Sequence, residues 1–275
     1  MRKILICLAL FAISASALHA ATVTNGIEYV TRPSGALLLD ASIPDGPGPF
    51  AAVIIVHGGG FARGNKVTYV PPIFQPLTRR GFAWFTIDYR LAPSAAAKDQ
   101  IDDVLSALTW VHEHAAHYKL DPKRIALLGE SAGAYLVDCV AMVAPQNAPI
   151  AAVVSFYGPA DFTFDSGTTK LPAAMRPFFG ITPQTTDVEA QLRRVSPYFM
   201  VHPGLPPFLL LHGTADEQVP YQQSPRFCQA LKAKGNQCEL YTVPAARHGL
   251  GQWEENTGQL EYKQKVVDWL KETLH

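Results

Sequence analysis

The sequence has little charge and no concentrated patch of it. Only 17% of the 275 residues are charged, 23 basic residues balance 23 acidic ones, and runs of like charge are short. A protein that tracks a nucleic-acid backbone needs a basic patch or stripe to neutralise phosphates. We therefore expect no nucleic-acid partner.

Long apolar runs are also scarce, and the one that stands out is at the start of the chain. Residues 4–18 are mostly apolar, follow two basic residues at positions 2 and 3, and precede two alanines. This arrangement is typical of a secretory signal peptide, and its polar interruptions leave it short for a spanning helix. We expect residues 1–20 to be removed after Ala20 and the protein to be exported to the periplasm or the medium, without a membrane partner afterwards.

Cysteine is the third scarcity, with four in the chain, of which Cys7 is in the expected signal peptide. Cys228 is placed on an expected helix and Cys238 on the strand that follows, with a turn at residues 234–236 between them. Helix and strand rises bring the two sulfurs to the same height, and an oxidising compartment permits a bridge. The sequence leaves two alternatives, a disulfide between Cys228 and Cys238 or two unpaired thiols. Cys139, inside an apolar helical segment, is expected to be a core residue.

What the sequence does contain is an alternation of apolar strand-length runs and helix-period segments. The helical segments centre on residues 101–111, 136–143, 227–231 and 266–270. The strand runs are nearly continuous in apolarity, as strands buried on both faces require; they are residues 52–56, 82–87, 125–128, 150–156, 208–211 and 240–243. The pattern predicts an α/β protein with a mostly parallel central sheet and helices on both faces. Residues 27–30 and 37–43 are expected to form an antiparallel hairpin at the sheet edge.

The length fits one large domain, residues 21–275. One interval, residues 158–206, is too long for a simple connection and is broken by prolines. We expect it to be a small cap insertion over the strand ends, where it would shape a substrate site.

Two glycine-rich motifs follow two of the expected strands. Residues 129–133 (GESAG) lie between a strand and a helix, where the glycines allow a sharp turn that lifts the Ser131 hydroxyl clear of the backbone. Residues 57–60 (HGGG) follow another strand, and two of their backbone N–H groups, with that of Ala132, can face a developing oxyanion. Together the motifs predict acyl transfer by a serine nucleophile.

The remaining catalytic groups are expected later in the chain, in the order acid and then base. Asp216 is in the loop after residues 208–211, and His248 is in the loop after residues 240–243. Each is at the C-terminal end of a buried strand, where such sheets place their sites. We expect His248 to take the proton of Ser131 and Asp216 to orient His248. Glu217 is the alternative acid.

Other polar residues have structural interpretations. His112, His114 and His117 are expected at a solvated helix end, without a metal site or any cofactor. Glu130 is expected to support the turn around the nucleophile, and His212 to form hydrogen bonds in its own loop. Residues 88–90 (DYR) are interpreted as a buried ion-pair brace.

On these motifs the chain resembles the α/β-hydrolase carboxylesterases over about residues 24–274, particularly the branch similar to bifunctional feruloyl and acetyl-xylan esterases. The hormone-sensitive-lipase-like esterases share the two glycine motifs but usually carry an N-terminal helical cap. The residues that carry the resemblance are 57–61, 88–90, 121–133, 157–161, 196–197, 206–209, 212–220 and 246–249.

The resemblance implies an α/β-hydrolase fold and a carboxylesterase-type serine hydrolase that acts through an acyl-enzyme intermediate. It implies short-chain, acetyl or feruloyl esters of small molecules or polysaccharides as substrates. The implied residues are a triad of Ser131, Asp216 and His248 and an oxyanion hole of Gly59, Gly60 and Ala132.

Two other functions remain open at this point, because a fold does not fix a function. One is a serine peptidase similar to prolyl oligopeptidases, which activity on an amide against an ester would distinguish. The other is a catalytically inactive binding protein on the same fold, although such proteins normally lose the nucleophile or the histidine. The oligomeric state is not determined by the sequence.

Overall fold

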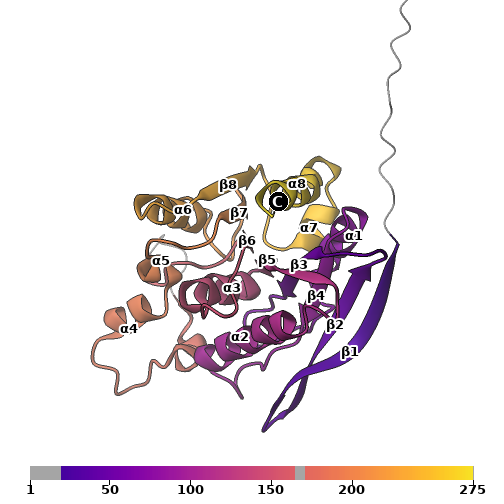
Figure 1. Cartoon of the computed structure of the whole chain (residues 1–275). Helices are drawn as coiled ribbons and strands as arrows, with labels where there is room; N and C mark the ends of the chain where they lie inside the picture. Colours follow the sequence, from indigo (N-terminus) through magenta and orange to yellow (C-terminus); the bar gives the residue numbers. More distant parts are fainter. Residues whose placement is uncertain (1–19, 165–170, 275) are drawn as a thin grey trace, which may run out of the picture.

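The centre of the molecule is one mixed β-sheet (Figure 1). The computed structural model describes residues 20–164 and 171–274, and the eight strands found there have the order β1-β2-β4-β3-β5-β6-β7-β8. The strands are β1 (Ala21–Arg32), β2 (Gly35–Pro44), β3 (Phe50–Val56), β4 (Ala83–Ile87), β5 (Leu120–Glu130), β6 (Ala152–Phe156), β7 (Phe208–Gly213) and β8 (Cys238–Val243). Strands β4, β3, β5, β6, β7 and β8 run parallel, while β2 pairs antiparallel with both β1 and β4. The predicted mostly parallel sheet is confirmed.

Helices cover both faces of this sheet, and Figure 1 shows α2 and α3 on one side with α1, α7 and α8 on the other. Strand β3 is buried between the two layers, with residues 52–56 fully inaccessible. The side chains of α2, α3 and α6 share one core cluster, and those of α1, α7 and α8 share the other. The helices are α1 (Pro71–Arg79), α2 (Ala97–Glu113), α3 (Ala132–Val143), α6 (Gln223–Ala233), α7 (Leu250–Glu254) and α8 (Glu261–Thr273). This arrangement is the α/β-hydrolase fold.

The first two strands form the predicted hairpin at the sheet edge, but they are longer than expected. Pairing runs from Ala21 opposite Pro44 to Arg32 opposite Gly35. The sequence pattern identified only the apolar parts of these strands. An edge hairpin with one solvated face also contains polar positions, which apolar runs alone do not mark.

Helix α1 was not predicted, because it begins with two prolines and contains Pro76. Proline at the first position of a helix loses no hydrogen bond that the helix would otherwise make. Ile73 and Leu77 of α1 are fully buried against the sheet, so tertiary packing supports a helix that intrinsic propensity disfavours. The expected buried face of α3 also needs one correction, since Val143 at the end of that helix is 49% exposed.

The described part of the interval between β6 and β7 contains short helices only. In its described part these are η1 (Ala173–Met175), η2 (Pro177–Phe179), α4 (Val188–Arg194) and α5 (Pro197–Met200). Phe178 and Phe179 are buried and pack on Phe61 and Tyr135, which attaches the segment to the sheet layer. We call residues 158–206, the bounds expected from the sequence, the insertion.

The expected signal peptide falls almost entirely on residues 1–19, which lie outside the described residues. Within the ranges that the structure describes, no helix has the length and apolarity needed to cross a bilayer.

The structure joins Cys228 of α6 to Cys238 of β8 by a disulfide bond, with 5.6 Å between the Cα atoms. Cys139 is buried and free, in keeping with its expected place in the core.

Candidate active site

The chain turns sharply between β5 and α3, and Ser131 lies at the turn. Its φ of 54° and ψ of −117° are rare for a residue with a side chain. The Ser131 N–H donates to the Phe156 carbonyl at 2.9 Å, which ties the turn to the neighbouring strand. A Cβ atom on Gly129 would lie 2.3 Å from the Gly133 oxygen, and one on Gly133 would lie 2.2 Å from the Val56 oxygen. Both positions therefore require glycine, and the turn presents the serine hydroxyl at the C-terminal edge of the sheet.

Three side chains that follow three different strands meet at this edge. Ser131 Oγ lies 2.8 Å from His248 Nε2, and His248 Nδ1 lies 2.6 Å from Asp216 Oδ2. Because an ionised carboxylate only accepts hydrogen bonds, Nδ1 of His248 donates to Asp216. Nε2 is then unprotonated and accepts the hydrogen bond of the serine hydroxyl. The structure thus brings together the three residues that the sequence placed far apart.

The Asp216 carboxylate is fully buried but has several hydrogen-bond donors around it. The backbone N–H groups of Gln218 and Val219 donate to Oδ1 at 2.9 and 2.8 Å, and His212 Nε2 lies 3.4 Å from Oδ2. Burial raises the pKa of Asp216, but the hydrogen bonds from His212 and His248 outweigh burial and hold the pKa well below its usual range. Asp216 is therefore an anion next to His248 at neutral pH.

Glu217, the alternative acid, lies elsewhere. Its side chain is 76% exposed and pairs with Arg247 at 3.1 Å on the surface. Its neighbour Asp216 occupies the position beside His248, because the loop after β7 turns one carboxylate inward and the next outward.

The segment from residue 57 to residue 61, which we call the HGGG turn, lies next to Ser131 at the end of β3. Gly59 has φ 106° and Gly60 has φ 62°, both in the region that favours glycine. The Gly59 carbonyl accepts the N–H of Arg63 at 3.1 Å, and a Cβ atom on Gly59 would lie 2.2 Å from the Arg63 oxygen. The close return of the chain therefore excludes any side chain at this position.

The near end of the HGGG turn is held by buried polar groups. The Gly58 N–H donates to Glu130 Oε1 at 2.9 Å, and the Tyr89 hydroxyl donates to the His57 carbonyl at 2.9 Å. Burial raises the pKa of Glu130, although the Gly58 bond and the nearby His248 act against this. The supporting role expected for Glu130 thus takes a specific form, a bond that links the nucleophile turn to the HGGG turn.

A cavity of about 290 Å³ opens beside the Ser131 hydroxyl. Gly60 and Ala132 line it, and Gly59 lies one residue behind. Most of the remaining wall is apolar and comes from the insertion and from the loop after β7. Its other lining residues are Phe61, Pro159, Asp161, Phe162, Phe164, Leu171, Pro172, Met175, Gln218, Val219, Pro220, Gln223 and His248.

Several of these contributors were not assigned from the sequence. The N–H groups of Gln218 and Val219 on Asp216 follow a local pattern, since an Asp side chain often accepts from backbone two residues on. No sequence motif marks Phe162 or Met175 as a cavity residue, because their positions depend on how the insertion packs over the strand ends.

The other histidines have local partners. His112 Nε2 lies 3.0 Å from the Pro149 carbonyl, and the His114 ring stacks on Trp110. His212 bonds to the Val219 carbonyl within its loop, as expected, and also to the Ser224 hydroxyl at the start of α6. Across residues 20–164 and 171–274, no group of three or more His, Cys, Asp or Glu side chains is placed to hold a metal ion.

Sequence comparison matches residues 39–231 to the model of the BD-FAE family. A Mycobacterium tuberculosis protein described as a probable carboxylic ester hydrolase, LipM, is 32% identical over 212 residues, which cover 70% of this chain and 48% of that protein. A probable isoprenylcysteine alpha-carbonyl methylesterase of Arabidopsis thaliana, ICMEL1, is 30% identical over 244 residues, or 82% of this chain and 51% of that one. The chain thus spans about half the length of the curated relatives it matches.

Solved structures match over a larger share of their length. The propionate-bound form of a Thermogutta terrifontis esterase, Est2, aligns with a TM-score of 0.72 at 26% identity and covers 96% of both chains. A truncated carbohydrate esterase from gut microbiota aligns with a TM-score of 0.77 at 24% identity, over 94% of this chain and 98% of that one, and supports the fold alone.

Proposed function

The chain belongs to the BD-FAE family, and on that premise we propose that it is a carboxylic ester hydrolase with Ser131 as nucleophile. His248 is the general base and Asp216 the residue that orients it. The observation that carries the proposal is the continuous hydrogen-bonded line from Ser131 Oγ through His248 to Asp216, beside a cavity at the sheet edge.

The proposed reaction has two halves. Ser131 Oγ attacks the ester carbonyl carbon while His248 Nε2 takes the hydroxyl proton, and the carbonyl oxygen becomes an oxyanion facing the N–H groups of Gly59, Gly60 and Ala132. When the intermediate collapses, His248 gives the proton to the leaving alcohol, and the acyl group remains on Ser131. Water activated by His248 then attacks this acyl-enzyme, which releases the acid and restores the serine. Asp216, an anion throughout, stabilises the imidazolium formed in each half.

The cavity supports a substrate with a short acyl group. Its volume of about 290 Å³ is at the lower end of the range for ligand pockets, and its wall is mostly apolar. We propose short-chain esters, or acetyl or feruloyl esters of small molecules or polysaccharides, as the substrate class.

The test compares Ser131→Ala with wild type on 4-nitrophenyl acetate and on a 4-nitroanilide amide. We expect wild type to cleave the ester far faster than the amide, and the variant to lose about 10⁴-fold or more in kcat. Ser34→Ala, at an exposed serine in the β1–β2 turn, is the matched control and should keep wild-type turnover. Activity of Ser131→Ala above a tenth of wild type would remove Ser131 as the nucleophile. Faster cleavage of the amide would favour a peptidase.

Export to the periplasm or the medium is part of the proposal. It is supported by the signal-like pattern of residues 1–20 and by a disulfide, which persists in oxidising compartments. Mass spectrometry of the protein from fractionated cells should find Ala21 as its first residue; an uncut chain in the cytoplasmic fraction would contradict export.

A further inference from the structure

The far end of the HGGG turn has an unusual backbone. Phe61 follows Gly60 with φ 66°, although it carries a large side chain. Such a conformation persists only when its surroundings fix it. The Phe61 ring lines the cavity and is buried against Tyr135 and Phe178, so packing holds the ring. The backbone needs a separate support.

That support is a pair of hydrogen bonds to one oxygen. The Phe61 carbonyl accepts the Ala92 N–H at 2.9 Å and the Gln100 Nε2 amide at 2.8 Å. Ala92 belongs to the loop after β4, and Gln100 belongs to the first turns of α2. Two segments separate in sequence from the nucleophile turn therefore converge on the turn that holds the proposed oxyanion donors.

Gln100 is fully buried, and its other amide atom, Oε1, has no hydrogen-bond partner among the described residues. A buried acceptor without a partner destabilises a protein, and an apolar side chain of similar volume would avoid that cost. Stability alone therefore does not explain an amide at this position, whereas the need for its N–H group at the Phe61 carbonyl does.

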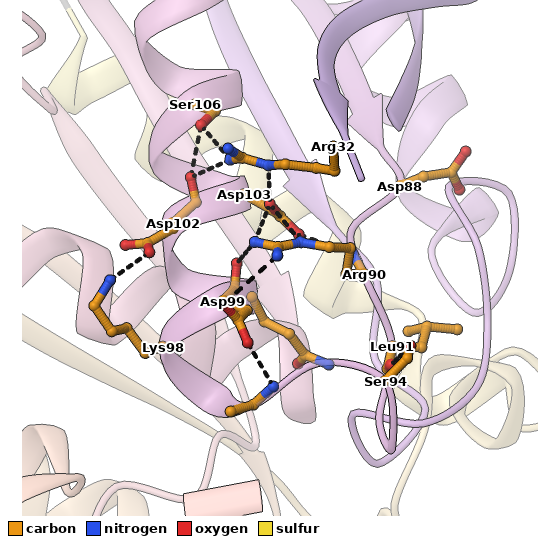
Figure 2. Close-up of polar contacts among 12 residues, drawn as sticks. Arg32, Asp88, Arg90, Leu91, Ser94, Lys98, Asp99, Asp102, Asp103 and Ser106 are labelled. Carbon is orange, nitrogen blue, oxygen red and sulfur yellow. Dashed lines mark hydrogen bonds and ion pairs between the residues drawn. The ribbon is translucent and has the colours of Figure 1, made fainter. Parts of the chain in front are cut away.

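The loop that carries Ala92 is held to α2 by an ion pair, shown in Figure 2. Asp103 is completely buried and accepts the backbone N–H of Arg90 at 3.0 Å and its guanidinium at 2.8 Å. The Arg90 guanidinium also donates to the Asp99 carbonyl at 2.9 Å. Arg32 of β1 donates to the same Asp103 carboxylate at 2.8 Å, and its other hydrogen bonds go to the Asp102 carbonyl and the Ser106 hydroxyl of α2.

We propose that Gln100, together with the Arg90–Asp103 pair acting through Ala92, positions the HGGG turn from behind by holding the Phe61 carbonyl. These are positioning residues, since they are not among the residues that line the cavity beside Ser131. The inference rests on the proposed function only for its kinetic effect. Glu130 and Tyr89 already fix the near end of the turn, so the far end is the part that depends on Gln100 and Arg90.

The kinetic test uses Gln100→Leu and, as a second variant, Asp103→Asn. Both should lower kcat for 4-nitrophenyl acetate about tenfold and leave KM within about twofold, because oxyanion donors act mainly in the transition state. The inhibition constant of a trifluoromethyl ketone analogue should rise by the same factor as kcat falls. The melting temperature of Gln100→Leu should stay at or above that of wild type, which separates positioning from loss of fold.

Arg32→Gln is the matched control, since it removes the other, partly buried ion-pair partner of the Asp103 carboxylate and none of the hydrogen bonds to the Phe61 carbonyl. It should lower the melting temperature and leave kcat within about twofold. The positioning role is overturned if Gln100→Leu has the same kcat as Arg32→Gln. It is also overturned if Gln100→Leu and Arg32→Gln both lose kcat in proportion to their loss of melting temperature.

Hydrogen exchange of residues 57–63 in the substrate-free protein gives a measurement that does not depend on activity. Exchange at these amides should accelerate in Gln100→Leu and not in Arg32→Gln. Should wild type hydrolyse no ester, the proposed function fails, while this exchange result still decides whether Gln100 holds the turn. Equal exchange in the two variants would overturn the positioning proposal.

Discussion

The turns at the strand ends and the insertion that faces them are built in opposite ways. In the turns, backbone lies directly on backbone: added Cβ atoms at Gly59, Gly133 and Gly213 would each lie 2.2 Å from a carbonyl oxygen. In the insertion, α4 buries none of its residues, and the cavity wall there consists of separate side chains such as Phe162 and Met175.

This contrast separates two tasks. Atoms that carry charge in a reaction must be placed within a few tenths of an ångström, and packed backbone at the ends of buried strands provides that accuracy. A wall that selects an acyl group needs only the right volume, which side chains of the insertion can vary without disturbing the sheet. We therefore expect changes at the strand ends to alter turnover or stability, and changes in the insertion to alter selectivity.

The largest effect is expected at the loop after β7. Asp216→Asn should lower kcat by up to about 10⁴-fold, because the amide favours the wrong tautomer of His248. Glu217→Gln is the control from the adjacent residue, and its steady-state rate should stay within about twofold of wild type because its carboxylate faces Arg247 at the surface. The opposite ranking of the two rates would transfer the acid role to Glu217.

A second test concerns Asp138, which is buried in α3 behind the nucleophile turn. Burial raises its pKa to about 8, against a hydrogen bond from Ser155 at 2.9 Å. Since the folded pKa exceeds the unfolded value of 3.8, the folded state retains a proton that the unfolded state loses above about pH 4. The stabilisation that this retained proton gives the folded state is complete below the unfolded pKa of Asp138 and is lost as pH rises through the folded pKa. Relative to Asp138→Asn, the free energy of unfolding of wild type should fall by about 1 kcal/mol per pH unit between pH 5 and 8.

Urea unfolding at several pH values provides this measurement, with Asp45→Asn as the control at an exposed carboxylate. Parallel pH profiles of wild type and Asp138→Asn would show that Asp138 is ionised in the folded protein.

A third test removes the disulfide and asks whether the position of His248 depends on this bond. The bond closes a loop with a sequence separation of 10, for which chain entropy gives about 2–3 kcal/mol. The double variant Cys228→Ser with Cys238→Ser should lose that much unfolding free energy and keep kcat within about twofold at a temperature where it is folded. Reductant should lower wild type to the level of the variant and leave the variant unchanged. Free, alkylatable thiols at both positions in the exported, non-denatured protein would argue against the bond.

The smallest effect is expected in the insertion. Wild type should prefer acetyl and butyryl esters, and Met175→Ala should raise the ratio of kcat/KM for octanoate to that for butyrate by several-fold. Each methylene that gains a buried position contributes about 0.8 kcal/mol. Phe199→Ala, at an exposed position outside the cavity lining, is the matched control. A specificity constant that already rises steadily from acetate to decanoate in wild type would contradict the short-acyl proposal.

Local patterns in the sequence were sufficient for much of the fold. Continuous apolar runs predicted the central strands, because burial on both faces leaves no polar positions to interrupt them. The glycines of residues 129–133 and 57–60 predicted two tight turns, since only glycine lets one backbone segment approach another so closely. Helix α1 was not predicted because its stability comes from the packing of Ile73 and Leu77 against the sheet. Helix propensity, which depends on local sequence alone, does not include this packing.

The sequence by itself determined which residues were candidates for the site. Only the tertiary structure decided which of these residues lie next to one another. Asp216 and Glu217 are adjacent and chemically alike, and the sequence predicted Asp216 as the acid while leaving Glu217 as the alternative. The fold chose by turning one toward His248 and the other toward Arg247. The disulfide and the convergence of Ala92 and Gln100 on the Phe61 carbonyl are of the same kind. For the disulfide the sequence left two alternatives, and for the Phe61 carbonyl it gave no prediction, because a covalent bond or a hydrogen bond depends on distances that exist only once the sheet and its helices have packed.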